Sequence, residues 1–426
     1  MAPAPAGADE AAVEPRSSAF GALSSFYAPG TFPRSQPSAP PIYRVAGGGR
    51  RASDCVAVDV VLRAAESSRA LMQLVEAGLE KYDAGSVVVA FTCAAKLDNG
   101  KDMATLEPSP AWGELVQRLI DCTACLEPRG MSMSAYAAAR LLCGDERLLN
   151  GLAEVGVRRA VDFGATDVAK ACWAFAKLRF VEEEPAARFW AASAQVAPRT
   201  VKGARYVDVS MMAWAFASTD RGNRAIFDEV AAATREASAT LAPRSIAGTA
   251  WALGRAGHRD SGLLAELARL ARGCVDDFSA HDASALCWGL AVAGHADVGL
   301  FEALAARLVE TKTLRSLSLP LAAELAWAYA SARVFHDALF AVAEELCASS
   351  ATEMETEDAA GLAWALAAAG RKGPSPAVDS LASYAERFVG RFRRGELQVL
   401  AWSLRELRAE AAATCIRERL EQCARP

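Results

Sequence analysis

Seven tryptophans recur at a nearly constant spacing along the chain, and each begins a similar four-residue word. They stand 41, 37, 37, 39, 37 and 38 residues apart, and the words read WAFA, WAFA, WALG, WGLA, WAYA, WALA and WSLR. The seven residues are Trp173, Trp214, Trp251, Trp288, Trp327, Trp364 and Trp402. A repeat of about 38 residues predicts a solenoid, because units of this size bury their apolar faces only against neighbouring units.

Each unit reads as two helices. Asp or Ser stands six residues before the tryptophan in five of the seven units, where we expect it to cap the first helix. In the Trp327 unit, Pro320 predicts an earlier start near Ser318. The first helix should end about 11 residues later at a turn. The glycines expected to stop it stand six residues after their tryptophans: Gly257, Gly294 and Gly370.

A second apolar face follows each turn. Its first large side chain stands 13 residues after the tryptophan, at Phe227, Leu264, Phe301 and Phe340. The tryptophan itself is predicted to be a core residue between layers, and a row of exposed, base-stacking indoles is the alternative. Small residues four before the tryptophan indicate close helix contacts. They are Ala169, Ser210, Ala247, Ser284, Ala323 and Ala360.

The composition agrees with a helical array, since 52% of the residues are hydrophobic and alanine is abundant. We predict an all-α, right-handed α-solenoid of about nine or ten helix-turn-helix repeats. Upstream, Ala138 and Thr92 take the tryptophan position in weaker units. A charged helix over 410–423 should close the array. The expected organisation is a leader (1–51), degenerate repeats (52–150) and a regular array (151–426).

Residues 1–51 differ from the rest of the chain. They hold eight prolines and five arginines but only three acids. Such a leader resembles an organellar transit peptide, which would direct the protein to a mitochondrion or chloroplast. A disordered tail is the alternative interpretation.

The sequence offers little for catalysis. It contains no phosphate-binding, dinucleotide-binding, hydrolase or metalloprotease motif, and its four histidines stand singly. The eleven cysteines are scattered, and one C-x-x-C (Cys122 and Cys125) lacks a second pair for a zinc site. The sequence contains no unbroken apolar run of about 18 residues, so we predict no membrane span. We expect no enzyme activity, cofactor, metal or small-molecule substrate.

The W-A-[LFY]-[AG] words in a helical pair resemble the octotricopeptide repeats of organellar RNA-binding proteins, which are related to the repeats of RAP-domain and FAST-kinase-like proteins. The resemblance covers roughly residues 130–426 well and 55–130 poorly. It implies sequence-selective binding of single-stranded RNA, and a role in organellar RNA stability, processing or translation. We expect no RAP domain in residues 1–426, so the resemblance implies no nuclease activity for them.

Modular RNA readers present variable side chains on a constant scaffold. The residue three before the tryptophan varies in this way, at Lys170, Met211, Gly248, Ala285, Glu324, Gly361 and Val399. The end of the first helix and its turn carry cations that could follow phosphates, among them Arg179, Arg221, Arg255, Arg333 and Arg371. Both sets are candidate RNA-binding residues, and an unconstrained solvated surface is the alternative interpretation.

The net charge of the chain argues against RNA binding. The whole chain carries a net charge of −5, so the residues after the leader carry −7. Nucleic-acid binders are usually basic, because neutralised phosphates supply most of the non-specific affinity. A protein-binding scaffold without RNA contact is therefore the alternative function. A positive stripe along the solenoid would favour RNA, and an apolar or acidic groove would favour a protein partner.

Overall fold

The computed structural model describes residues 53–97, 106, 109–182, 184–237, 241–350 and 354–422. Within these ranges the chain forms twenty α-helices and short 3-10 turns, with no β-strand. The predicted all-α class is confirmed. The leader, with its predicted transit peptide, lies outside the described residues.

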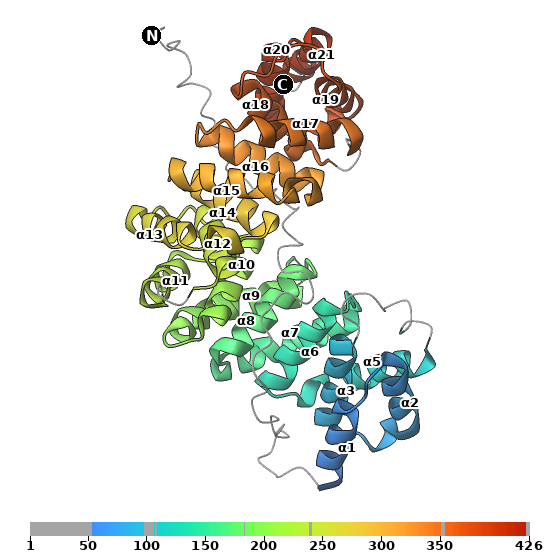
Figure 1. Cartoon of the computed structure of the whole chain (residues 1–426). Coiled ribbons are helices and arrows are strands. Elements are labelled where there is room, and N and C mark those ends of the chain that lie inside the picture. The colour runs from blue at the N-terminus through green and yellow to red at the C-terminus, as the bar shows by residue number, and fades with distance from the viewer. Residues whose placement is uncertain are drawn as a thin grey trace. The chain divides into compact units, whose positions relative to one another are not determined.

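The chain divides into two compact units between residues 237 and 238. The helices of both units are labelled in Figure 1. The predicted boundary near residue 150, between degenerate and regular repeats, stays a prediction. Five helical pairs form the N-terminal unit: α1 (Ser53–Arg63) and α2 (Ser68–Gly78), α3 (Ala84–Leu97) and α5 (Pro110–Cys122), α6 (Pro128–Arg140) and α7 (Glu146–Arg159), α8 (Ala165–Lys177) and α9 (Glu184–Val201), α10 (Tyr206–Thr219) and α11 (Arg224–Ala237).

Five further pairs form the C-terminal unit: α12 (Pro243–Arg255) and α13 (Ser261–Arg272), α14 (Ala280–Val292) and α15 (Val298–Glu310), α16 (Leu319–Ser331) and α17 (Asp337–Ser350), α18 (Thr356–Ala368) and α19 (Pro376–Arg387), α20 (Arg394–Glu406) and α21 (Glu410–Gln422). The last helix matches the predicted closing helix.

Both units have two layers. The first helix of each pair packs on the first helix of the next. This holds for α3, α6, α8 and α10 in one unit and for α12, α14, α16, α18 and α20 in the other. The second helices form the outer layer, where α7 contacts α9 and α17 contacts α19. This neighbour-to-neighbour packing is that of an α-solenoid.

The predicted N-cap position is wrong by three residues. Each tryptophan-bearing helix begins eight residues before its tryptophan, so the acid six before it occupies the third helical position. There the Asp167 carboxylate accepts the backbone N–H of Gly164 at 3.3 Å, and that of Asp358 accepts Glu355 N–H at 3.1 Å. The acid therefore supplies the returning half of a capping box.

The offset of eight residues holds without exception in the seven tryptophan-bearing helices, α8, α10, α12, α14, α16, α18 and α20. In the α16 pair, Ser318 is the N-cap, as Pro320 predicts. The turn that follows each of these seven helices also has a fixed geometry. Six residues after the tryptophan the backbone is left-handed, with φ of 66° at Gly257 and 72° at Gly370. The predicted glycine stops are confirmed.

The same left-handed turn corrects the upstream frame. Leu142 is left-handed with φ of 53°. Arg179, which stands six residues after Trp173, has nearly the same φ of 56°. The residue six before Leu142 is Tyr136, so Tyr136 occupies the tryptophan position of the α6 pair, where Ala138 was expected. The sequence alignment of the repeats missed this position because tyrosine replaces the tryptophan of the W-A motif. Thr92 keeps its expected position in α3, which also begins eight residues earlier.

The core lies between and within the layers. Trp173, Trp214, Trp251 and Trp288 are at most 3% exposed, which agrees with their predicted core role. The large residues of the second helices at Phe227, Leu264, Phe301 and Phe340 are buried as well. Burial decreases toward the C-terminus, where Trp327 and Trp364 are half-buried and Trp402 is 37% exposed. Trp402 is therefore not the core residue that the frame predicts.

Adjacent first helices meet most closely between α12 and α14. A Cβ added at Gly254 would lie 2.5 Å from the carbonyl oxygen of Gly289, and one at Gly289 would overlap the backbone of Ala250. Polar contacts join other neighbours. The Thr166 hydroxyl donates to the Asp208 carboxylate at 2.9 Å, and Ser132 donates to Asp167 at 2.8 Å. These contacts fix each pair against the next.

Candidate ligand-binding faces

The first helices share one face that keeps partial solvent exposure. Residues seven and three before the tryptophan position, the position itself and the residue four after it lie on one side of a helix, because they are spaced by four, three and four residues. In α8 these are Thr166, Lys170, Trp173 and Lys177, and all except the tryptophan are partly exposed. We call this side of the first helices the open face.

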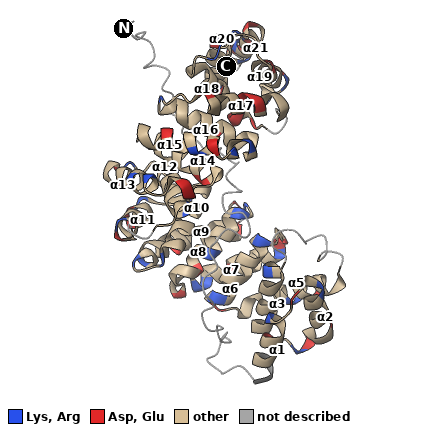
Figure 2. Cartoon of the chain, viewed as in Figure 1, with Lys and Arg blue, Asp and Glu red and all other residues tan. Residues whose placement is uncertain are grey.

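The open face of the N-terminal unit is basic along α3, α6 and α8. These three helices contain five cations and one acid, Asp167. Three of the cations occupy the same position, four residues after the tryptophan position: Lys96, Arg140 and Lys177. Among the described residues, no acidic side chain forms an ion pair with Lys96 or Arg140. The charges of both units can be followed in Figure 2.

Lys170 lies at the centre of this basic face. Its ammonium donates to the Met133 sulfur at 3.0 Å and lies 5.6 Å from the ring centroid of Tyr136. Burial lowers the pKa of Lys170, and the nearby cation Arg129 lowers it further. Burial and Arg179 likewise lower the pKa of Lys177. Positive charge is thus crowded here, and an anion would relieve the repulsion.

The structure contradicts most of the predicted base-reading set. Met211, Gly248 and Glu324 are buried, and so is Ala285. Side chains excluded from solvent have no surface to present to a base. The position three before the tryptophan varies because each neighbouring helix approaches it differently. Lys170 is the member of the set that joins the basic face.

The predicted rim arginines have separate environments. Arg221 forms an ion pair with Glu182 at 2.8 Å and Arg371 with Asp337 at 2.9 Å, each linking a turn to the preceding pair. Arg179 and Arg333 are exposed and hold the left-handed turn position. Arg255 ends α12 on the open face of the C-terminal unit. The five occupy three different positions of the repeat, four, six and seven residues after the tryptophan.

Three first helices of the C-terminal unit have the opposite character. Helices α14, α16 and α18 contain four acids and neither lysine nor arginine. Glu324 is fully buried, and neither of its carboxylate oxygens has a hydrogen-bond partner among the described residues. Burial, together with Asp358 and Glu357, raises the pKa of Glu324 well above its ordinary value. Burial and Glu396 raise the pKa of Glu357 to about 8.

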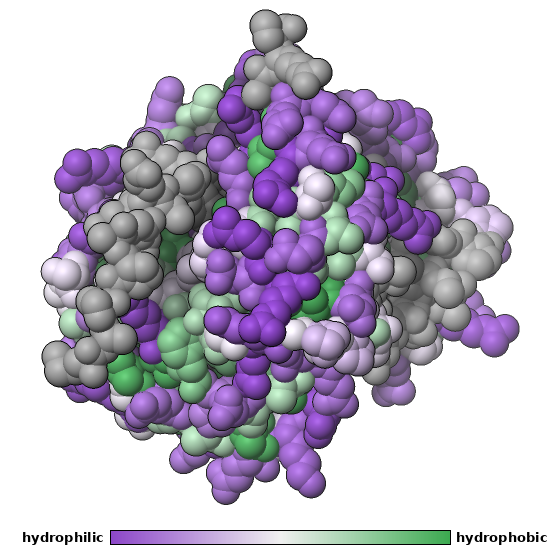
Figure 3. Space-filling view, turned by 90° about the horizontal axis from the view of Figure 1, so that it is seen from above, coloured by the Kyte–Doolittle hydropathy of each residue, from purple (hydrophilic) through white to green (hydrophobic). Residues whose placement is uncertain are grey.

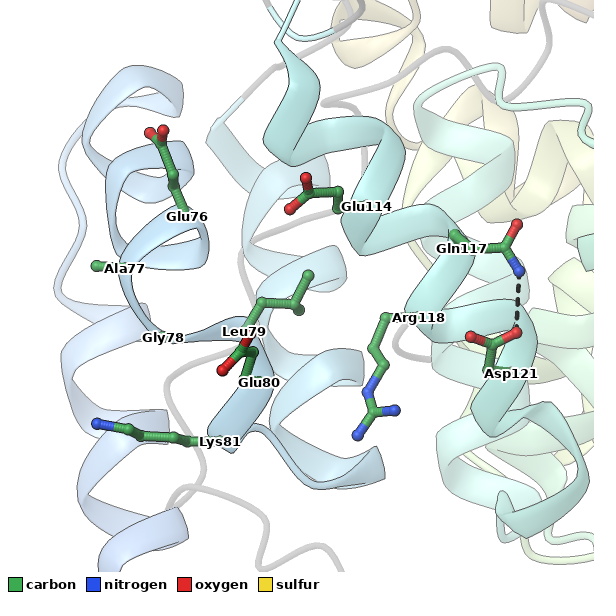
Figure 4. A pocket seen from close by; sticks show the side chains of 10 residues that line it. All are labelled: Glu76, Ala77, Gly78, Leu79, Glu80, Lys81, Glu114, Gln117, Arg118 and Asp121. Carbon is green, nitrogen blue, oxygen red and sulfur yellow. Dashed lines mark hydrogen bonds between the residues drawn. The ribbon is translucent and has the colours of Figure 1, made fainter.

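One pocket of about 740 Å³ lies on the N-terminal unit, away from its basic face (Figure 4). It is formed by the end of α2 and by α5. Its charged side chains are of both signs, and Gln117 donates to Asp121 at 2.9 Å. The side chains drawn in Figure 4 do not converge on one point. No predicted site residue lines it.

Thiols, metal-binding groups and surface hydropathy are the remaining features of the described residues. Burial raises the pKa of the Cys172 thiol to about 12, which makes it a poor nucleophile. Among the described residues, no group of three or more His, Cys, Asp and Glu side chains is placed to hold a metal ion. Within the same ranges no helix is long and apolar enough to cross a membrane. The surface seen in Figure 3 is largely hydrophilic, with hydrophobic residues in small patches.

Comparisons with known proteins leave the family open. The sequence matches no protein-family model and no curated protein. Among solved structures, a chain described as "Homology model of the full-length AP-3 complex in an intermediate open conformation" is similar at 10% identity, covering 86% of this chain and 75% of that one. The TM-score is 0.25, so this likeness carries no argument about function.

Proposed function

We propose that this chain binds single-stranded RNA along the basic open face of α3, α6 and α8. The observation that carries the proposal is the recurrence of one cation at the same position of three consecutive pairs, at Lys96, Arg140 and Lys177. A helical solenoid that follows a nucleic-acid backbone needs such a repeated charge, because phosphates recur along the strand.

Two further features support RNA over another polyanion. Tyr136 is half-buried on this face, with the Lys170 ammonium 5.6 Å from its ring centroid and the Trp173 ring centroid 5.0 Å away. An aromatic ring beside a cation offers a base a stacking surface and its phosphate a counter-charge. The W-A-[LFY]-[AG] words and their resemblance to octotricopeptide repeats support the same ligand. A role in organellar RNA metabolism follows from that resemblance and from the arginine-bearing leader.

The acidic net charge is compatible with this function because the charge is unevenly distributed. The acids of α14, α16 and α18 belong to the other unit. Screening limits the reach of an exposed charge to about 8 Å at physiological ionic strength. A local set of cations therefore governs binding at its own face.

The test is fluorescence anisotropy with the full chain and a labelled single-stranded RNA of random sequence, in about 50 mM salt. We expect micromolar binding. The triple variant Lys96→Gln, Arg140→Gln and Lys177→Gln should weaken it about tenfold or more and lower the salt slope by about 2, since each lost phosphate contact removes ~0.7 for a single strand.

A matched triple variant removes equal charge from residues outside α3, α6 and α8: Lys202→Gln, Arg224→Gln and Arg315→Gln. These cations form exposed ion pairs with Glu229, Asp228 and Glu345, and such pairs contribute little to stability. Equal loss in both variants would show that net charge alone attracts RNA. No binding by the unaltered chain would favour the alternative, a protein-binding scaffold without RNA contact.

A further inference from the structure

The ammonium of Lys170 has hydrogen-bond donors that the fold does not use. An ammonium carries three N–H donors. One of them points to the Met133 sulfur at 3.0 Å, and a thioether is a weak acceptor. No oxygen or nitrogen of the described residues accepts a hydrogen bond from Lys170. Because the side chain is only half-buried, these donors are available to a ligand.

The carboxylates near Lys170 are engaged by other donors. Asp167 accepts the Ser132 hydroxyl at 2.8 Å, and Asp208 accepts the Thr166 hydroxyl at 2.9 Å. Both acids attract the ammonium through their charge, but among the described residues neither forms a salt bridge with it. Lys170 is therefore not the cation of a structural ion pair, and the packing of α8 on its neighbours does not account for its charge.

Lys170 occupies a position whose chemistry changes from one helical pair to the next. Three residues before the tryptophan position stand Val89 in α3, Met133 in α6 and Met211 in α10. The position four residues after it is different, because it carries a cation in α3, α6 and α8 alike. Phosphates are the same at every nucleotide, whereas bases are not. The repeated cations therefore suit the RNA backbone, and the unrepeated lysine suits a base.

The four bases differ in what their edges offer to an ammonium. Guanine presents two adjacent acceptors, N7 and O6. Adenine and cytosine place an amino group, itself a donor, on the same edge, and uracil offers the single acceptor O4. Guanine is thus the base that accepts two N–H donors of one ammonium together. The Tyr136 ring, whose centroid lies 5.6 Å from the ammonium, adds an aromatic surface for a purine.

We propose that Lys170 selects guanine at one position of the bound RNA. Its ammonium donates to O6 and N7 of the base, and the base packs against the half-buried ring of Tyr136. This selectivity rests on the proposed function, since it requires RNA on the basic open face. It adds a sequence-reading contact at one helical pair, whereas Lys96, Arg140 and Lys177 bind phosphates of any sequence.

The experiment compares two short labelled RNAs by fluorescence anisotropy with the full chain. Both are uridine strands, one with a central guanosine and the other with a central adenosine. We expect the guanosine strand to bind about tenfold tighter, which is the effect of one good base contact. Lys170→Met should abolish this preference and remain folded, because methionine stands at the same position in α6 and α10. Lys170→Gln should reverse the preference, since an amide pairs with N6 and N7 of adenine.

Lys177→Gln is the matched control, because it makes the same change on the same helix at a phosphate-binding position. It should weaken binding of both strands by the same factor and leave their ratio unchanged. If Lys170→Gln did the same, Lys170 would contact a phosphate and the guanine selection would be refuted. Equal affinity of the unaltered chain for both strands would refute it too, and would leave the proposed function intact. Failure to bind either strand would contradict both. Circular dichroism must show that each variant is folded.

Discussion

The phenol ring of Tyr136 packs on the indole of Trp173, with centroids 5.0 Å apart. The tyrosine replaces tryptophan in its own pair and remains half-buried beside Lys170. This contact joins α6 to α8 at the centre of the basic face. It leads to the first prediction.

Tyr136→Leu should weaken RNA binding about five- to tenfold, because base stacking on an aromatic ring contributes about 1–3 kcal/mol. Tyr136→Phe keeps the ring and should bind RNA like the unaltered chain. Anisotropy titration of both variants is the measurement. If leucine and phenylalanine gave the same affinity, no base would stack on this ring.

Asp208 is a second test, because it joins two helical pairs. It is 2% exposed, accepts the Thr166 hydroxyl at 2.9 Å and accepts Arg205 Nε at 3.0 Å. Asp208→Ala should lower the free energy of unfolding by about 2–3 kcal/mol, since it removes a buried, charge-assisted network. Urea denaturation measures the loss. Asp228→Ala, at an exposed ion pair with Arg224, should cost less than about 1 kcal/mol.

The close approach of α12 and α14 predicts an intolerant position. Gly289→Ala places a methyl group against the backbone of Ala250, so the helices must separate. We expect a loss of about 3 kcal/mol or more, at the upper end of overpacking effects. Gly113→Ala is the control, because an added Cβ on α5 meets nothing within 4 Å. That change should stabilise the protein by about 0.5–1 kcal/mol. Comparable melting temperatures for the two variants would contradict the packing.

The buried carboxyls predict a pH dependence. Burial raises the pKa of Glu357 to about 8 and raises that of Glu324 well above its ordinary value, so the folded state favours their protonated forms. The stability from this source is complete below the ordinary pKa of 4.5 and is lost as pH rises through 8. The double variant Glu324→Gln and Glu357→Gln cannot ionise. Its melting temperature should exceed that of the unaltered chain at about pH 8.5 and lose this advantage at about pH 5. An equal difference in melting temperature at the two pH values would show that ionisation of Glu324 and Glu357 does not govern stability.

The sequence predicted the repeat well because it depends on local rules. A tryptophan every 37 to 41 residues, a glycine six residues later and a large apolar residue after 13 are readable without a structure. The N-cap prediction failed at Asp167 and Asp358 because an acid is favourable at both the cap and the third helical position. Only the backbone geometry decides between them.

The candidate site was less predictable. Burial of Met211 and Glu324 depends on how closely the neighbouring helix approaches, which no local pattern encodes. The basic face was not predicted because Tyr136, and not a tryptophan, marks the repeat position in the α6 pair. Once Tyr136 is aligned with the tryptophans, Arg140 falls in line with Lys96 and Lys177, and the stripe can be read from the sequence.

The left-handed residue after each tryptophan-bearing helix has a consequence for how such a chain can lengthen. The reversal requires one backbone conformation, which glycine supplies at Gly294 and arginine at Arg333 or Arg408. A segment copied from one of these residues to the next contains a complete helical pair with both of its packing surfaces. Tandem duplication or deletion at these joints therefore changes the number of ligand contacts in whole steps and leaves the remaining pairs intact.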